Sequence, residues 1–197
     1  MRVELIEATN PDVMLRVMSI CRGKTCTQDT MVEALEAKPV PHASLLEFGW
    51  VCLLVEGVSV KTRIQLLRSR LFSTMERSTR SIDMTNAGIV VPTTSKTKGT
   101  MRKTMDSEMD DYSVAVINGE TFEDASYLLP LGVETDFFLA GNLRVWFEYF
   151  QKRLCKKHVQ DEHYRMAMRM FTTILGVFPT IAKAHPCKAC GACERQN

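Results

Sequence analysis

The chain has 197 residues, of which 45% are apolar and 24% are charged, and its formal net charge is only +2. This length suits one domain with a sizeable core, so we expect a single domain over residues 1–197. A net charge so close to zero gives no overall attraction for nucleic acid or for an acidic membrane, and neither is expected as a partner. No apolar run approaches the roughly 18 residues of a membrane span, and the acidic amino terminus is unlike a secretory signal, which predicts a cytoplasmic protein of a cell or of an infected host.

The first elements expected along the chain are a short strand, two helices and a buried strand. Residues 3–6 alternate apolar and charged side chains as a strand does, and the run from Asn10 to Asp12 has residue types that begin helices. Pro39 and Pro41 end the second helical stretch, because proline interrupts a helix. Residues 49–57 form an apolar run between two glycines, rich in residues that favour strands, and predict a buried strand.

A helix that ends in two arginines is expected next. Ser59 has the residue type of an N-cap, and apolar residues from Val60 to Leu67 recur at helical spacing. Past this helix, an extended backbone would direct the guanidinium groups of Arg68 and Arg70 to one side, where both could bind a phosphate group. The alternative is a charged turn exposed to solvent, and this segment alone does not separate the two interpretations.

The middle of the chain contains a polar segment and then a helix start. Residues 92–111 are polar and without sustained periodicity, which predicts a mobile loop or lid. Asn118-Gly119 has the composition of a turn. Thr121 has the spacing of a capping box to the acidic residue three positions on, so a helix is expected to begin near Phe122.

The longest helical pattern runs from residue 136 to residue 170. Its apolar residues repeat as one helix face: Leu143, Trp146, Phe147, Phe150 and Leu154. Arg144 and Arg153 lie roughly 13 Å apart along such a helix, on opposite edges of that face. Spacing alone is compatible with two solvated arginines at the rim of a buried stripe.

The seven cysteines are an odd number without the spacing of a disulfide framework, which predicts reduced thiols. Three of them, Cys187, Cys190 and Cys193, lie in a Cys-rich tail over residues 185–197. With His185 they raise the hypothesis of a zinc or iron-sulfur site. The sequence has no second, separate Cys-x-x-Cys knuckle, and the cluster lies at the extreme carboxyl end, so we predict no metal.

The segment after the two-arginine helix carries six polar residues in a fixed order: Arg68, Arg70, Ser73, Glu76, Ser78 and Arg80. This order resembles the signature of the flavin-dependent thymidylate synthases, which is Arg-His-Arg, then Ser, then Asn-Glu, then Ser-x-Arg-Tyr. Ser69, Met75 and Ser81 stand where that signature has His, Asn and Tyr.

Three further elements resemble the same family in the same order. Upstream, His42-x-Ser44-x-x-Glu47-Phe48 is similar to its His-x-Ser/Thr-x-x-Glu-His element, with Phe48 at the second His. Downstream there are matches to its Leu-Pro, Thr, Asn-x-Arg and Arg run: Leu129-Pro130, Thr135, Asn142-x-Arg144 and Arg153. The tail from Pro186 to Glu194 is similar to a Cys-x-x-x-Gly-x-Cys-x-Glu ending seen in some members.

The resemblance implies an α/β (α+β) fold with a mixed sheet core and long helices, and a homotetramer whose sites are shared between chains. It also implies two groups of ligand contacts. The residues expected at FAD are His42, Ser44, Glu47, Arg68, Ser69, Arg70, Glu76, Asn142 and Arg144. The residues expected at a pyrimidine nucleotide monophosphate are Gln65, Ser78, Arg80 and Arg153.

The activity that the resemblance implies is methylation of dUMP to dTMP, with methylenetetrahydrofolate and NADPH as co-substrates and Arg153 as the catalytic residue that polarises the pyrimidine. Ser126 stands where the family commonly has an arginine for the nucleotide phosphate, and Gln160 aligns only with a one-residue insertion. Two alternatives therefore remain open. One is a paralogue that methylates UMP or hydroxymethylates dUMP, and the other is a nucleotide- or flavin-binding subunit without catalysis.

Overall fold

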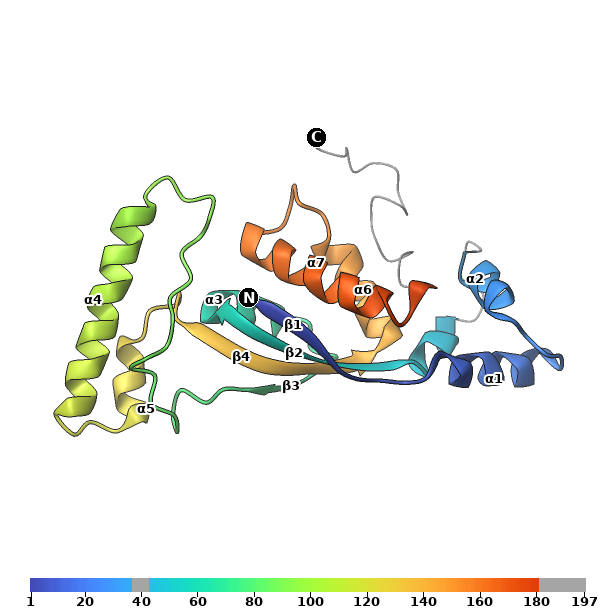
Figure 1. Ribbon diagram of the computed structural model, residues 1–197, viewed down its shortest axis with the longest axis horizontal. Coiled ribbons are helices and arrows are strands. Elements are labelled where there is room, and N and C mark those ends of the chain that lie inside the picture. Colours follow the sequence, from blue (N-terminus) through green and yellow to red (C-terminus); the bar gives the residue numbers. More distant parts are fainter. Residues whose placement is uncertain (37–42, 181–197) are drawn as a thin grey trace.

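The computed structural model describes residues 1–36 and 43–180, which form an elongated molecule with one sheet at its middle (Figure 1). The sheet has the strand order β1-β2-β4-β3. Its strands are β1 (Arg2–Ala8), β2 (Trp50–Ser59), β3 (Ser73–Glu76) and β4 (Glu134–Asn142). The helices are α1 (Pro11–Arg22), α2 (Gln28–Glu36), α3 (Val60–Leu66), α4 (Lys98–Ile117), α5 (Phe122–Ala125), α6 (Leu143–Arg153) and α7 (Asp161–Leu175), with short 3-10 turns η1 (Ala43–Glu47) and η2 (Ser126–Leu128).

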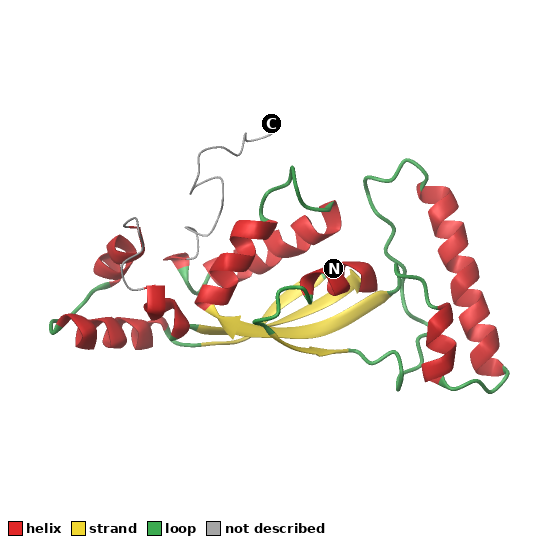
Figure 2. Ribbon diagram, turned by 180° about the vertical axis from the view of Figure 1, so that it is seen from behind, coloured by secondary structure: helices red, strands yellow, loops and turns green. Residues whose placement is uncertain are grey.

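One face of the sheet is covered by α6 and α7, whereas α1 and α2 lie at one end of the molecule and α4 and α5 at the other (Figures 1 and 2). The combination of helices and a sheet confirms the expected fold class. All three strand pairs are antiparallel, where a mixed sheet was expected. None of the helices in the described ranges is long and apolar enough to cross a membrane.

The main core lies between the sheet and the two covering helices. Alternate residues of β2 are buried, as the strand period requires: Val51, Leu53 and Val55. The predicted apolar face of α6 packs against them, with Leu143, Trp146, Phe150 and Leu154 buried and Phe147 partly buried. Helix α7 adds Met166, Ala167, Met170 and Ile174 at the same helical spacing.

No described helix covers the opposite face of the sheet (Figures 1 and 2), and several apolar side chains of its strands are exposed. Leu54 of β2 and Met75 of β3 are both directly opposite Phe138 of β4, so the three form a row across the strands. Phe138 is 42% exposed and Met75 is 73% exposed. Trp50, which is paired with Asn142 on the same face, is 45% exposed.

Several predicted elements are confirmed. Residues 3–6 lie in β1, and Asn10 caps α1 by accepting a hydrogen bond from the Asp12 amide. Ser59 and Thr121 are the N-caps of α3 and α5, with their side chains accepting from the amides of residues 62 and 124. The turn at Asn118-Gly119 is present, and Gly119 has φ 93°, a conformation that favours glycine.

Two predicted elements are wrong. The loop expected over residues 92–111 is helical from Lys98 onward, because Met101, Met105, Met109 and Tyr112 recur at helical spacing on a side of α4 where Met109 and Tyr112 are buried. The continuous helix expected over residues 136–170 is instead β4, α6 and α7. The buried residues Thr135, Phe137 and Leu139 alternate as in a strand, and the polar stretch after Leu154 separates the two helices.

Candidate functional site

Helix α3 and the turn after it carry three of the predicted ligand residues: Gln65, Arg68 and Arg70. The backbone after α3 is a turn and not the extended segment expected, since the Ser69 amide donates to the Leu66 carbonyl at 2.8 Å. Arg68 and Arg70 are exposed, and neither takes part in an ion pair within the described part of the chain. The turn therefore leaves two guanidinium groups available to an anion.

The start of α3 is held by a buried carboxylate from α7. Glu162 is only 3% exposed, and its two oxygens accept from the Ser59 amide and the Ser59 hydroxyl, both at 2.7 Å. Next to it, Thr62 donates to the side-chain oxygen of Gln160 at 3.4 Å. These contacts give Gln160 a structural role in the described residues, and they fix α3 against the beginning of α7.

The end of α3 is joined to α7 and α6 by a chain of buried polar side chains. Gln65 Oε1 lies 3.3 Å from His163 Nδ1, and His163 Nε2 lies 3.0 Å from the hydroxyl of Tyr149. Burial, together with the smaller effect of the positive charge of Arg153, lowers the pKa of His163 to about 4. Burial raises the pKa of Tyr149, partly offset by the charge of Arg153. Both side chains are therefore neutral near pH 7.

Arg153, the last residue of α6, is the predicted catalytic residue and belongs to this same region. Its positive charge lowers the pKa of both Tyr149 and His163. Its Nε atom is buried and has no hydrogen-bond partner in the described structure. A buried N–H without an acceptor is costly, so this atom is suited to a ligand oxygen. The structure thus places Arg153 within electrostatic range of the hydrogen-bonded chain that ends at Gln65.

A second group of predicted residues meets where β4 passes into α6. Arg144 Nη1 is 2.6 Å from Glu47 Oε1, and Arg144 Nε is 3.8 Å from Glu148. The side chain of Asn142 accepts from the Val145 amide and so caps α6. Glu47, Asn142 and Arg144, all predicted at FAD, are therefore brought together at one end of the sheet.

Glu76, also predicted at FAD, is paired with Arg63 of α3. Both side chains are about one-fifth exposed, and burial lowers the pKa of Arg63. The Nε atom of Arg63 is buried and has no hydrogen-bond partner in the described residues. Glu76 is thus positioned by an arginine that the sequence analysis did not single out.

Ser78 and Arg80 lie apart from the other groups, in an exposed turn near α5. Arg80 Nε is 2.8 Å from Glu123 Oε1, and both side chains are more than half exposed. Ser126, which stands where the family commonly has a phosphate-binding arginine, donates to the Glu123 carbonyl at 2.7 Å. Arg80 and Ser126 therefore both contact the same residue of α5.

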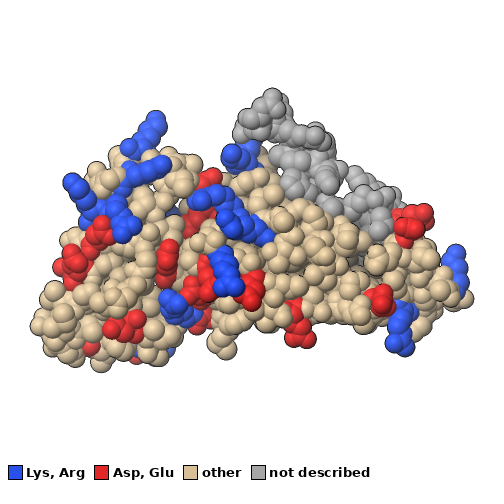
Figure 3. Space-filling model, in the orientation of Figure 1, with Lys and Arg blue, Asp and Glu red and all other residues tan. Residues whose placement is uncertain are grey.

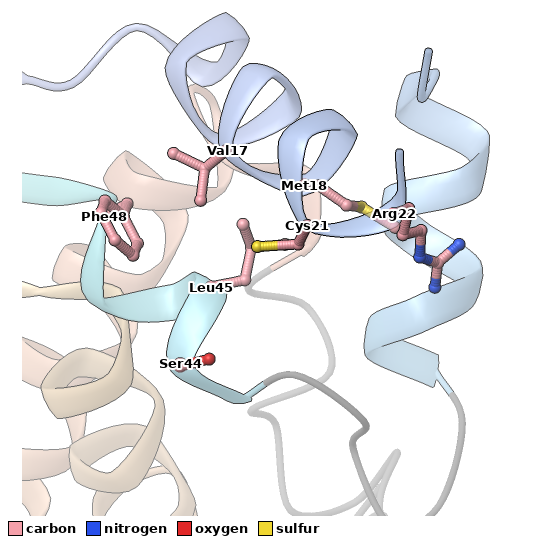
Figure 4. A pocket seen from close by; sticks show the side chains of 7 residues that line it. All are labelled: Val17, Met18, Cys21, Arg22, Ser44, Leu45 and Phe48. Atoms are coloured by element: carbon pink, nitrogen blue, oxygen red, sulfur yellow. The ribbon is translucent and has the colours of Figure 1, made fainter. Parts of the chain in front are cut away.

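A small pocket lies between α1 and η1 and contains Ser44, another residue predicted at FAD (Figure 4). Its volume is about 100 Å³, well below the roughly 300 to 1,000 Å³ of ordinary ligand sites. It is lined by Val17, Met18, Cys21, Arg22, Ser44, Leu45 and Phe48. Phe48 closes one side of it, and the pocket by itself does not hold a dinucleotide.

No hydrogen bond or ion pair between residues of the described ranges links the Arg144 group, the Gln65 network and the Arg80 turn. Acidic side chains lie among the Lys and Arg side chains on the face shown in Figure 3, so that face has no single basic surface. His42 and the tail with His185, Cys187, Cys190 and Cys193 lie outside the described residues. Within the described ranges, no cluster of His, Cys, Asp or Glu could hold a metal ion.

Sequence reasoning missed Tyr149, Glu162 and His163. The signal for two of them was present in α7, where Glu162 and His163 occupy the same helix face as the buried residues Met166 and Met170. Polar side chains on a buried helix face need partners, so their position predicts a buried polar network once the helix is recognised.

Known proteins resemble this chain in its fold and over most of its sequence. Residues 4–180 match the family model described as Thymidylate synthase complementing protein. The flavin-dependent thymidylate synthase of Geobacter sulfurreducens is 31% identical over 166 residues, which cover 81% of this chain and 71% of that protein. The flavin-dependent thymidylate synthase of Saccharolobus solfataricus is 31% identical over 144 residues, 71% of this chain, but the match spans only 55% of that longer relative.

Two solved structures share the fold at low sequence identity. Thymidylate Synthase X from Helicobacter pylori, solved with FAD and dUMP, has a TM-score of 0.81 at 15% identity and matches 96% of this chain and 100% of its own. A UMP/dUMP methylase from Streptomyces cacaoi, bound with 5-Br dUMP, has a TM-score of 0.77 at 17% identity and matches 93% of each chain.

Proposed function

The chain belongs to the flavin-dependent thymidylate synthase family, and we propose that it methylates dUMP to dTMP with FAD as cofactor and with methylenetetrahydrofolate and NADPH as co-substrates. The family consists of methyltransferase enzymes, so the protein is an enzyme. A cytoplasmic location is part of the same proposal, because the nucleotide and folate substrates are water-soluble.

The observation that carries this proposal is that Gln65 lies within hydrogen-bond distance of the buried His163, on whose pKa the charge of Arg153 also acts. Gln65 and Arg153 were both expected at the pyrimidine nucleotide, and the buried Nε of Arg153 has no partner in the described structure. A uracil ring offers carbonyl oxygens that accept such hydrogen bonds. In the proposed reaction Arg153 donates to one of these oxygens and stabilises the negative charge that develops on the ring. Stabilisation of developing charge by fixed donors is usually the largest single contribution to catalysis.

The exposed arginines fit the anionic part of FAD. Arg68 and Arg70 lie on one turn without ion-pair partners in the described residues, and a guanidinium binds a pyrophosphate oxygen strongly because it stays charged and donates in a fork. Asn142 and Arg144, where β4 passes into α6, would hold a second part of the same cofactor. Bound and reduced, FAD supplies a hydride, so the chain itself needs no strong nucleophile.

A homotetramer with shared sites is proposed for two reasons. No hydrogen bond or ion pair links the groups of predicted ligand residues within the described part of one chain, which fits sites that a neighbouring chain completes. The uncovered row of Leu54, Met75 and Phe138 is an apolar sheet face of the kind that packs against another protein surface. The open sheet face and the separate groups of predicted ligand residues both support an assembly of several copies of the chain.

The acceptor nucleotide and turnover are tested with purified protein. A yellow preparation that consumes dUMP in the presence of methylenetetrahydrofolate and NADPH supports the proposal. Turnover with UMP in place of dUMP, or a hydroxymethylated product, would favour the paralogue, and dCMP serves as the nucleotide that lacks one uracil carbonyl. A yellow protein that binds nucleotide without turnover would favour the binding subunit.

A further inference from the structure

Tyr149 and His163 form a buried pair that no matched motif explains. Tyr149 is 2% exposed and His163 is 0% exposed, and they come from the two helices that cover the sheet. His163 Nδ1 lies 3.3 Å from Gln65 Oε1, and the positive charge of Arg153 acts on both members of the pair. Gln65 and Arg153 are both expected at the nucleotide, so the pair adjoins the proposed pyrimidine site.

The direction of the hydrogen bonds in this pair follows from the Tyr149 hydroxyl, since the distances alone fit either imidazole tautomer. Tyr149 keeps its proton in this buried position, and the one acceptor recorded for its hydroxyl among the described residues is His163 Nε2 at 3.0 Å. A buried hydroxyl donates to the acceptor it has, so Nε2 carries the lone pair. The neutral imidazole then has its proton on Nδ1, which donates to Gln65 Oε1 at 3.3 Å.

This direction decides what Gln65 presents to a ligand. Its oxygen is occupied by the His163 N–H, and rotation of the amide would place two donors against each other. The NH₂ group of Gln65 is therefore the part left for a ligand, and it donates. The neighbouring guanidinium of Arg153 also has donors only. Both groups thus select an acceptor such as a pyrimidine carbonyl oxygen.

We infer that His163, oriented by Tyr149, is a positioning residue of the nucleotide site, which fixes Gln65 as a hydrogen-bond donor toward a carbonyl oxygen of the pyrimidine. This inference rests on the proposed function, because it needs a pyrimidine nucleotide beside Gln65. Tyr149 and His163 thereby become part of the site, with one proton on the Tyr149 hydroxyl and one on His163 Nδ1.

The first test compares dUMP binding to four flavin-loaded variants by calorimetry. His163→Leu removes both ring nitrogens and should weaken dUMP binding about tenfold, since Gln65 loses its fixed orientation. His163→Asn places an amide N–H where Nδ1 was and should recover most of the affinity. Tyr149→Phe should weaken binding about threefold. Met170→Leu, another buried substitution in α7, is the matched control and should bind as the parent does.

The second test measures which ring nitrogen of His163 carries the proton, and it needs no bound nucleotide. In nitrogen-15 spectra of the imidazoles, His163 of the parent should be the Nδ1–H tautomer at pH 7, and Tyr149→Phe should convert it to a mixture. If His163→Leu does not fold, the Tyr149→Phe variant supplies both readouts.

The outcomes separate the inference from the proposed function. A parent that binds no pyrimidine nucleotide would refute the proposed function, and this inference would fall with it. A parent that binds dUMP while His163→Leu and Tyr149→Phe bind it equally well would refute the inference alone. An Nε2–H tautomer in the parent would also overturn it.

Discussion

Arg80 and Arg144 show how single residues are prepared for a ligand in this chain. Each is exposed and paired with a carboxylate, Glu123 in one case and Glu47 in the other. Exposed pairs of this kind contribute little to stability, so an anionic ligand can replace the carboxylate at small cost. The resemblance in sequence identified both arginines and Glu47. It did not predict the two ion pairs, because each carboxylate is distant in sequence from its arginine and only the fold brings them together.

Arg80→Ala should weaken dUMP binding by about tenfold or more, because a charge-assisted contact contributes about 1.5 to 3 kcal/mol and about 1.4 kcal/mol is a factor of ten. Calorimetry on the flavin-loaded protein measures this. Glu123→Gln is the matched control, since it removes the competing carboxylate and leaves Arg80 in place, and it should bind dUMP at least as tightly as the parent. Equal affinities of Arg80→Ala and the parent would remove Arg80 from the site.

Arg144→Ala should reduce the flavin content of the purified protein, because Arg144 is the cation of the Glu47 and Asn142 group. The absorbance of bound flavin per chain measures the loss. Arg165→Ala removes a similarly exposed arginine that is paired with Asp161 elsewhere on the surface, and it should keep the flavin of the parent. If Arg144→Ala keeps it too, the assignment of Asn142 and Arg144 to FAD is wrong.

At the scale of elements, α3 is held at both ends by two consecutive residues of α7. Glu162 accepts from Ser59 at the start of α3, and His163 contacts Gln65 near its end. The sequence predicted α3 and its cap from local residue types. It did not predict the break between α6 and α7, since the apolar repeats of the two helices resemble one long pattern on either side of the short polar stretch after Leu154.

The buried position of His163 should make stability depend on pH. Its pKa in the folded chain is about 4 and its ordinary value is 6.5, so the unfolded chain takes up the proton first as the pH falls. The free energy of unfolding is therefore unaffected by this residue above about pH 6.5 and decreases between there and about pH 4, by about 3 kcal/mol in total.

Denaturant unfolding of the parent and of His163→Asn across this pH range measures that effect. The asparagine does not titrate, so the difference in unfolding free energy between the two proteins isolates the histidine from other acid-sensitive groups. A difference that does not change between pH 7 and pH 4 would mean that His163 is protonated equally in the folded and unfolded chains.

At the scale of the whole molecule, the sheet has one covered face and one apolar face that the described helices leave open (Figure 2). Sequence alternation in β2 and β4 shows which residues share a face, but it does not show whether a helix or another chain covers it. The homotetramer was expected from the resemblance and from an apolar helix face between Arg144 and Arg153, but that face packs in the core of the chain itself. The open sheet face is the surface that we propose for assembly.

Phe138→Glu places a charge in the middle of that face and should lower the mass of the assembly in light scattering. Ile117→Glu is the control, because Ile117 is 82% exposed at the end of α4, away from the sheet. The control should keep the assembly of the parent. A parent that is monomeric and fully active would contradict shared sites altogether.

Thymidylate synthesis by this protein is tested most directly by following the carbon that is transferred to dUMP. The flavin-loaded protein is incubated with dUMP, NADPH and methylenetetrahydrofolate labelled at its transferable carbon, and the nucleotide product is analysed by mass spectrometry. We expect labelled dTMP from the parent and little or none from Arg153→Ala. Unlabelled dUMP recovered unchanged from a parent that binds both flavin and nucleotide would contradict it.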